Sequence, residues 1–559
     1  MELLDLPEDV LHVIVSYLRK KNALNLALTT KRLSGLALPR IAAVAECHAP
    51  ADLRRLQKYL LSRRRSRAHC LRSLIVSPFT FYPDDDEYDP DDWLRSLGNA
   101  ADNFQDFTQA PYLIADILVR CHNICHLDLE RFQPCLRRDR RIGTALVAMT
   151  GLKRLSLGVL GDTVVSLLQS CQSGLTYLKL WYHDERGFQL QGEPKTFPVL
   201  LATLSHFRSL QSLELCSFTP SEPISAAQIS MTPQFPSITH LRLSEALPQA
   251  LSLVSLCPNL RTLIFSLAID GLIEQHLSTA PLLRGGPRWR PLQHLRLGNH
   301  QEISCVLDHI DKVDILHFIS ALPSIDPQKE PFARFLRFLR VTSPVELYLP
   351  LALTNSSIGS LWEQVVQCAP RLRILDLKVS TSRYTYSSKC DKWLDTLLAT
   401  LGILPIVCLR LYVHPVSCPI ARGNVPVGFS YRCNYHEEPD DSRMCADARK
   451  MERRRIETMP TLPQRLMDAV PSLRYLALID SQPNNTSWDV GADDEWPITD
   501  GGDDDYQAPH WDEVRETDWT LSTCWWRVVE GSLGRTLETI SAEEAERVQH
   551  QIIQEAAVV

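Results

Sequence analysis

The sequence is poor in glycine and has no excess of basic residues. It contains 22 glycines among 559 residues, with neither a Walker-type loop nor a Gly-x-Ser-x-Gly elbow, which disfavours loops that cradle phosphates. The 59 lysines and arginines are outnumbered by 66 aspartates and glutamates, for a formal net charge of −7. Because no global positive field attracts polyanions, we expect no nucleic-acid partner.

Long apolar runs and a secretion signal are also missing. No apolar run approaches the roughly 18 residues that a membrane span needs, and acidic residues stand near the N-terminus where a signal peptide carries a basic stretch. The 16 cysteines have no fixed spacing, which in such a chain indicates reduced, mostly buried thiols. The sequence therefore predicts a soluble protein of the cytoplasm and/or nucleus with no membrane partner.

Clusters of residues suited to metal binding or catalysis are few. His122, Cys125 and His126 are crowded into one short segment that leads into an expected strand, so buried cysteines beside a solvent-facing histidine explain it better than a zinc site. A looser group of cysteines and a histidine at residues 433–445 lacks a clear fourth ligand. We therefore expect no metal, no cofactor and no catalytic residue, and the protein is not expected to be an enzyme.

Three charged runs leave two interpretations open. The arginines of residues 63–67 suit a nuclear localisation signal or a nucleic-acid patch, but they also suit the exposed side of a helix at residues 53–61, which we favour. The acidic runs at residues 83–92 and 489–506 suit basic targets, but such runs are more often solvated and disordered.

Residues 6–38 have the pattern of a compact helical unit. Pro7 suits a first helical position, and apolar residues then follow at i, i+3, i+4 and i+7 up to Leu18. A second apolar run at residues 23–28 precedes Thr30, a good helix cap, and a third segment. A unit of this size cannot bury all of its apolar side chains, so the next domain or another protein must cover the rest. The side chains in question are Leu6, Pro7, Ile14, Leu18, Leu24, Leu28 and Leu33.

From residue 71 onward an apolar-x-x-apolar-x-apolar pattern recurs. Its twelve occurrences begin at residues 71, 124, 152, 175, 210, 238, 260, 292, 336, 372, 406 and 473. The alternating last positions predict a short strand with its leucines on one side. Helical stretches such as residues 358–368 and 463–470 precede a proline, which ends a helix. Twelve occurrences in one order make chance clustering of a common residue a poor explanation.

Stacking of such helix–strand units predicts an irregular leucine-rich-repeat solenoid, with parallel strands inside and helices outside. The intervals range from 22 residues (238 to 260) to 67 residues (406 to 473), whereas typical repeats have about 20–29 residues, so insertions are expected. After the array, residues 525–529 and 535–540 flank Gly531 and Gly534 as a hairpin would. A helix is expected over residues 541–556, and together they would cap the last repeat.

The segment from Leu6-Pro7 to Leu18, with residues 24–28 and Lys31-Arg32-Leu33, closely resembles the F-box. With the repeats behind it, the chain resembles the F-box/leucine-rich-repeat proteins, particularly the divergent fungal type. The sequence departs from the motif where Leu33 replaces the usual aromatic residue and where Asn22 precedes Ala23 in place of an acidic residue.

The resemblance implies an α/β fold with a three-helix F-box at residues 1–46, the solenoid at 47–480, an acidic disordered loop at 481–520 and a small hairpin–helix cap at 521–559. It also implies a substrate-recognition adaptor of a Skp–cullin–F-box ubiquitin ligase. Its partners would be the Skp linker, through it a cullin, and an unknown protein substrate. The resemblance assigns the linker contact to the seven apolar residues named above: Leu6, Pro7, Ile14, Leu18, Leu24, Leu28 and Leu33. Substrate binding would use variable strand residues such as Arg154, Tyr177, Lys179, Glu214, Arg242 and Tyr475.

Two alternatives to the ligase adaptor stay open. In the first, the chain is a scaffold whose F-box-like helices only pack against its own solenoid, and the solenoid binds other proteins. In the second, it is an F-box protein that binds the linker but acts outside ubiquitination, for example in a chromosome-associated assembly. Linker binding separates the first alternative from the adaptor, and cullin recruitment separates the second.

Overall fold

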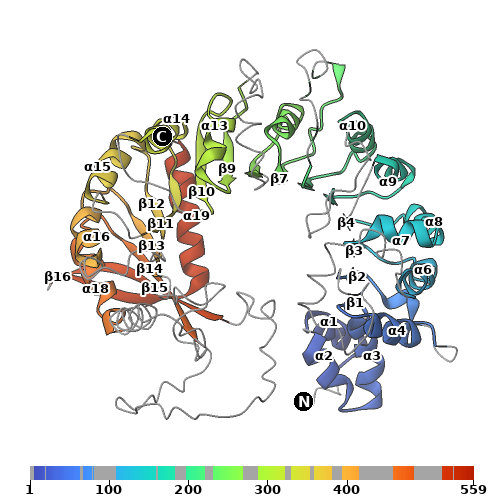
Figure 1. The fold of residues 1–559 in the computed structure, drawn as a ribbon. Coiled ribbons are helices and arrows are strands. Elements are labelled where there is room, and N and C mark those ends of the chain that lie inside the picture. The colour runs from blue at the N-terminus through green and yellow to red at the C-terminus, as the bar shows by residue number, and fades with distance from the viewer. Residues whose placement is uncertain are drawn as a thin grey trace, which may run out of the picture. The chain divides into compact units, whose positions relative to one another are not determined.

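The chain folds into two compact units, Met1–Arg290 and Pro291–Val559 (Figure 1). The structure is a computed structural model. It describes residues 6–18, 20–62, 67–77, 80, 109–158, 162–182, 197–218, 220, 224, 229, 231–267, 288–320, 329–352, 358–380, 393–413, 457–483, 519–532 and 534–558.

The first unit begins with three helices and continues as strands that alternate with helices. Its strands are β1 (Val44–Cys47), β2 (Ser73–Val76), β3 (His126–Leu129), β4 (Arg154–Leu157), β5 (Tyr177–Trp181), β6 (Ser212–Cys216), β7 (His240–Ala246) and β8 (Thr262–Leu267). Its α-helices are α1 (Glu8–Tyr17), α2 (Lys20–Ala27), α3 (Lys31–Ala42), α4 (Pro50–Leu60), α6 (Ala110–Arg120), α7 (Phe132–Arg138), α8 (Arg141–Ala148), α9 (Asp162–Leu167) and α10 (Phe197–His206). Short 3-10 helices are η2 (Ala68–Cys70), η6 (Leu168–Ser170) and η7 (Pro248–Leu256).

The second unit repeats the alternation and ends in a hairpin and a helix. Its strands are β9 (Leu292–Leu297), β10 (Val313–Phe318), β11 (Glu346–Ala352), β12 (Ile374–Ser380), β13 (Cys408–Val413), β14 (Tyr475–Pro483), β15 (Trp519–Gly531) and β16 (Gly534–Ile540). Its helices are η8 (His300–Glu302), α13 (Ile303–Val306), α14 (Glu330–Thr342), α15 (Ile358–Cys368), α16 (Trp393–Leu401), α18 (Leu462–Ala469) and α19 (Ala542–Val558).

Within each unit the strands pair in chain order. All pairs from β1 to β8 are parallel, as are those from β9 to β14, whereas β15 and β16 are antiparallel. The predicted α/β class is confirmed, and the stacking of helix–strand units in chain order is compatible with the predicted solenoid.

The strand sequences explain why one face of each sheet is buried. Leucines at alternate positions, such as Leu155, Leu157, Leu178 and Leu180, are 0% exposed, and helices cover one face of the strands (Figure 1). Because side chains alternate along a strand, the residues between these leucines point to the opposite side. We call that side the inner face of each unit.

A ladder of backbone hydrogen bonds just before the strands extends the parallel pairing. The amide of Lys153 donates to the carbonyl of Cys125, Thr176 donates to Lys153, and Gln211 donates to Thr176, each over 2.8–2.9 Å. Such bonds satisfy backbone groups that the buried turns would otherwise leave unpaired. They hold successive helix–strand repeats at one spacing although the loops between the repeats differ in length.

Eleven of the twelve pattern positions precede or begin a strand, and one prediction is wrong. Residues 336–341 lie inside α14 rather than in a strand, because Phe332, Phe335, Phe338 and Leu339 are all buried at helical spacing. The strand that follows α14 is β11. The twelve occurrences did not include β1 or β10, although Val313, Leu316 and Phe318 of β10 fit the pattern.

The predicted hairpin at the end of the chain is confirmed, since Val529 pairs with Thr536 and Gly531 with Gly534 across β15 and β16. β15 also pairs with β14 along nine residue pairs, so the hairpin covers the edge of the parallel sheet. Helix α19 takes another place: it lies on the inner face, opposite α15 and α16 (Figure 1). Residues 481–483 and 519–520, at the two ends of the predicted disordered loop, belong to β14 and β15.

Candidate functional site

The three N-terminal helices share a small apolar core. Leu11 of α1 and Leu33 and Leu36 of α3 are 1%, 3% and 5% exposed, and they pack together. Thr30 caps α3 by accepting a hydrogen bond from the amide of Leu33 over 3.2 Å. The guanidinium of Arg40 donates to the carbonyl of Leu18 over 2.9 Å, which ties α3 to the end of α1.

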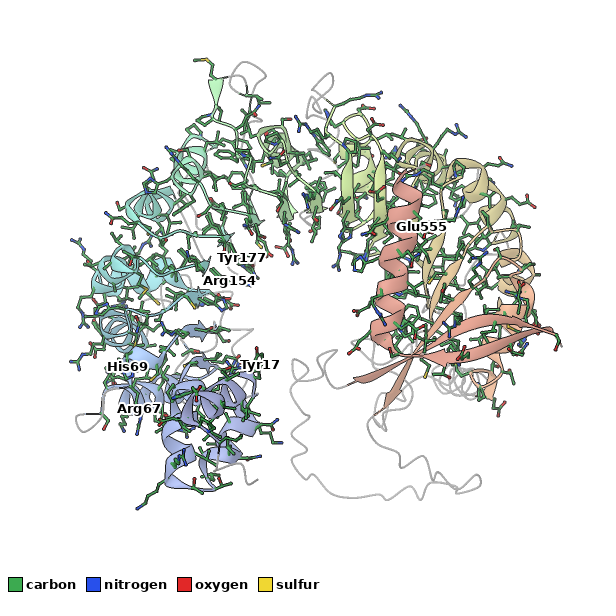
Figure 2. All side chains as sticks on the ribbon, turned by 180° about the vertical axis from the view of Figure 1, so that it is seen from behind. Tyr17, Arg67, His69, Arg154, Tyr177 and Glu555 are labelled. Atoms are coloured by element: carbon green, nitrogen blue, oxygen red, sulfur yellow. The ribbon has the colours of Figure 1, made fainter. Side chains whose placement is uncertain are left out.

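Helices α1 and α2, and the residue directly after α2, also expose large apolar side chains. Tyr17 is 84% exposed, Leu28 78%, Val13 57% and Leu24 47%, and Figure 2 shows Tyr17 at the surface of the helical unit. Isolated exposed apolar residues are ordinary, but four large ones on α1, on α2 and directly after α2 are unusual for a small bundle. We call these four residues the α1–α2 patch.

The structure divides the seven predicted contact residues into three groups. Leu24, Leu28 and Pro7 are exposed, and Leu6, Ile14 and Leu18 are partly buried. Leu33 lies in the core, so any effect of Leu33 on a partner would be indirect, through the position of α3. Their role in linker binding stays a prediction.

Sequence reasoning missed Val13 and Tyr17. The amphipathic analysis of α1 followed one stripe, of which Leu11 and Val15 are buried. Val13 and Tyr17 are four residues apart, a spacing that places two side chains on one helix face. A search for a second apolar stripe would have found them.

The inner face of the first unit is lined by charged and aromatic side chains. The guanidinium carbon of Arg154 lies 4.6 Å from the ring centroid of Tyr177, and Figure 2 labels both residues. The Lys179 ammonium lies 4.3 Å from the Trp181 ring centroid. Burial, with a contribution from the Glu214 carboxylate, raises the pKa of Tyr177 above its usual value. This tyrosine therefore acts as a neutral hydrogen-bonding and stacking group.

The register brings the predicted target-binding residues into rows. Arg154 pairs with Tyr177 across β4 and β5, and Lys179, Glu214 and Arg242 lie side by side across β5, β6 and β7. Alternating charges on neighbouring strands, with flanking aromatic rings, suit the recognition of a protein surface better than bond chemistry.

The inner face of the second unit is covered instead of open. Ile374, Cys408 and Ala477 are at most 1% exposed and form one cluster with Ala545 of α19. Tyr475, another predicted target-binding residue, packs against the same cluster. A target could reach Tyr475 only beside or after displacement of α19.

A buried charged group lies next to this cluster. The Arg410 guanidinium is 2.9 Å from an Asp376 oxygen and 3.9 Å from a Glu346 oxygen. Burial raises the pKa of Asp376 to about 6 and that of Glu346 above its usual value, although Arg410 opposes both shifts. Burial and nearby cations lower the pKa of His317 to about 3, so this imidazole, stacked 3.9 Å from the Tyr348 ring centroid, is neutral.

The other candidate segments form no site among the described residues. Cys121 is buried, Cys125 donates to the carbonyl of Arg72 over 3.3 Å, and the His126 ring lies 3.0 Å from the Ser73 hydroxyl. In the described part of the chain no three histidine, cysteine or acidic side chains are placed to hold a metal ion. The groups at 433–445, 83–92 and 489–506 lie outside the described residues.

No protein-family model matches this chain, and no curated protein matches it. The family resemblance of the N-terminal segment therefore stays a prediction. Of the helices that the structure describes, none has both the length and the apolar character for crossing a bilayer.

Proposed function

We propose that the chain is a substrate-recognition adaptor of a Skp–cullin–F-box ubiquitin ligase. The observation that supports this most is the α1–α2 patch, whose large apolar side chains are 47% to 84% exposed. Full burial of one such side chain stabilises a complex by about 1.5–3 kcal/mol, and a few buried apolar anchors dominate the energy of most interfaces. A linker protein that covers the patch would account for it.

The solenoid-like remainder of the chain would capture the target. The inner face of the first unit presents Arg154, Tyr177, Lys179, Glu214 and Arg242 in adjacent rows, which provides charge and aromatic surface without a catalytic group. In this proposal the chain performs no bond chemistry. It accelerates ubiquitin transfer by holding a target lysine close to the charged conjugating enzyme.

The test is binding of the purified full-length chain to a purified Skp linker. The double substitution Tyr17→Asp and Leu28→Asp places two charges in the interface but leaves the core of Leu11, Leu33 and Leu36 intact. We expect wild-type binding and at least a tenfold loss in the double variant, since each buried unpaired charge costs well over 1.4 kcal/mol. Tyr112→Asp is the control, because Tyr112 is also exposed (50%) but lies on α6.

Three other outcomes would change the conclusion. A wild-type chain that ignores the linker would leave a scaffold whose N-terminal helices serve only its own packing. Linker binding without cullin recruitment in a reconstituted mixture would favour an F-box protein that acts outside ubiquitination. Equal loss in the Tyr112→Asp control would show that the apolar patch is not the binding surface.

A further inference from the structure

Helix α19 has the surface pattern of a docked ligand. Ala545 is buried, and Val548, Gln549, Ile552 and Ile553 are partly buried, at spacings of 3, 4, 7 and 8 residues from Ala545. These spacings place all five side chains on one helix face. The residues of the other face are exposed, and they are Glu543, Glu546, Arg547, His550, Gln551, Gln554 and Glu555.

The sheet beneath α19 is built to receive an apolar helix. The inner-face positions of three successive strands include Ile374, Cys408 and Ala477, with Asp376 and Arg410 in the same row as Ala477. The corresponding rows of the first unit hold polar, charged or aromatic residues. Strands that carry apolar residues on both faces are stable only when a structural element covers each face, so the inner face needs a cover. The surface that receives α19 is therefore formed by the strands themselves, and we call this inner face of β11–β14 the groove.

Polar contacts fix the position of the helix at three points along its length. Near its start Glu544 accepts a hydrogen bond from Arg527 over 3.3 Å, and in its middle the Gln549 amide donates to Glu346 over 3.1 Å. At its end Arg371 donates to the carbonyl of Ala556 over 3.3 Å, where a cation suits the negative end of the helix dipole.

The groove is wider than the helix that occupies it. A cavity of about 310 Å³ lies on one side of α19, lined among others by His317, Glu346 and Gln549. A second cavity of about 480 Å³ lies on the other side, and its lining includes Arg371 and Arg474. The two cavities leave part of the groove beside α19 unfilled, so a helix that keeps the small residue against the sheet and carries longer side chains toward the cavities would fit at least as well.

We propose that the inner face of β11–β14 is a helix-binding site, that α19 is its intramolecular occupant, and that an amphipathic helix of a partner protein displaces α19 to bind there. The fitting partner helix presents a small residue, an amide four positions later and branched apolar residues at positions seven and eight. Only Ser541 separates α19 from β16, so the helix stays tethered when it leaves the groove. This inference makes no use of the α1–α2 patch, and linker binding does not bear on it.

The test uses a fluorescent peptide of residues 541–559 and the full-length chain. In the wild-type chain the tethered α19 competes at an effective concentration on the order of millimolar, so the peptide should bind weakly. The substitutions Ile552→Asp and Ile553→Asp weaken the chain's own helix, and the peptide should then bind about 10- to 100-fold more tightly. A peptide that carries the same two substitutions should not bind either chain.

The control variant is Gln554→Asp, which adds a charge to the neighbouring, exposed position of α19. It should leave peptide binding at the wild-type level. Hydrogen exchange of the amides of α19 shows whether the double variant has released the helix. Release of α19 without a gain in peptide binding would overturn the proposal. Persistent hydrogen-exchange protection of α19 in the double variant would also overturn it, because the apolar face of α19 would then not be what holds the helix in the groove. Exchange of α19 between two copies, seen as a dimer by light scattering, would replace the external partner with a second copy of this chain.

Discussion

The inner faces of the two units differ although their strands follow the same rule. In the first unit the rows between the buried leucines hold Arg154, Lys179 and Arg242, which remain partly or fully exposed. In the second unit the equivalent rows hold Ile374, Cys408 and Ala477, which are buried beneath α19, together with the ion pair of Asp376 and Arg410. The same backbone thus supports an open polar surface in one unit and a covered, partly apolar surface in the other, and the identity of a few alternate residues decides which.

The largest difference between the two faces should appear when a charge is placed in the covered groove. Ala477 is 0% exposed and lies beside Arg410 in the sheet, so Ala477→Lys should lower the free energy of unfolding of the second unit by about 3 kcal/mol or more. Urea denaturation measures the effect. In the first unit Ile264 lies beside Arg242 in the same way but is only partly buried, and Ile264→Lys should cost about 1 kcal/mol or less. Equal losses would contradict the contrast between covered and open faces.

The buried carboxylate of Asp376 should give the second unit a distinctive pH dependence. Its pKa is raised to about 6, above the value of about 3.9 in an unfolded chain, so the folded state holds its proton more tightly. This contribution to stability is complete below the unfolded pKa and is lost as pH rises through 6. Between pH 4.5 and 7 the wild type should lose about 2 kcal/mol relative to Asp376→Asn. Parallel pH profiles of the two proteins would contradict the burial of this carboxylate under α19.

Removal of one tie of α19 should have a smaller effect. Gln549→Ala leaves the buried Glu346 without the amide that donates to it, which should cost about 1–2 kcal/mol. Faster hydrogen exchange of the amides of α19 would report the loss. The exposed Gln554, changed to alanine in the same way, should alter the exchange by less than about 0.5 kcal/mol.

The smallest effect is expected on the open face. Arg154 stacks on Tyr177 while exposed to water, so Arg154→Gln should lower the free energy of unfolding by only about 0.5–1 kcal/mol. A second readout is the pKa of His126, which is lowered first by burial and then by the charge of Arg154, and NMR titration should show it rise in the variant. Arg261→Gln, just before β8, is the control and should leave the His126 titration unchanged.

Much of the fold was predictable, because strand position follows a local pattern. The alternating leucines of β4, β5 and β6 identify those strands without tertiary information. The pattern failed at residues 336–341, where Leu336, Leu339 and Val341 match the strand template by coincidence although they belong to helix α14. It was also not applied to β10, although Val313, Leu316 and Phe318 occupy the three apolar positions of the template.

The candidate site was predictable only in part. The excess of apolar residues in the first helices indicated an exposed surface, but which residues form it depends on how α1 rotates against α3. That packing buries Leu33 and turns Tyr17 outward, and it cannot be predicted from the properties of the individual residues. The position of α19 was missed for a similar reason. Its amphipathic pattern predicts that one helix face is buried, but it does not identify the surface against which that face packs.

The amino-acid sequence by itself determined the α/β class, the order of most strands, the C-terminal hairpin and the surplus of apolar side chains near the N-terminus. These depend on periodicities of two and 3.6 residues, which are local properties of the chain. Only the tertiary structure decided which apolar residues stay exposed and which face α19 covers. Both are choices among packings that satisfy the same local pattern, and contacts between residues far apart in the sequence select among them.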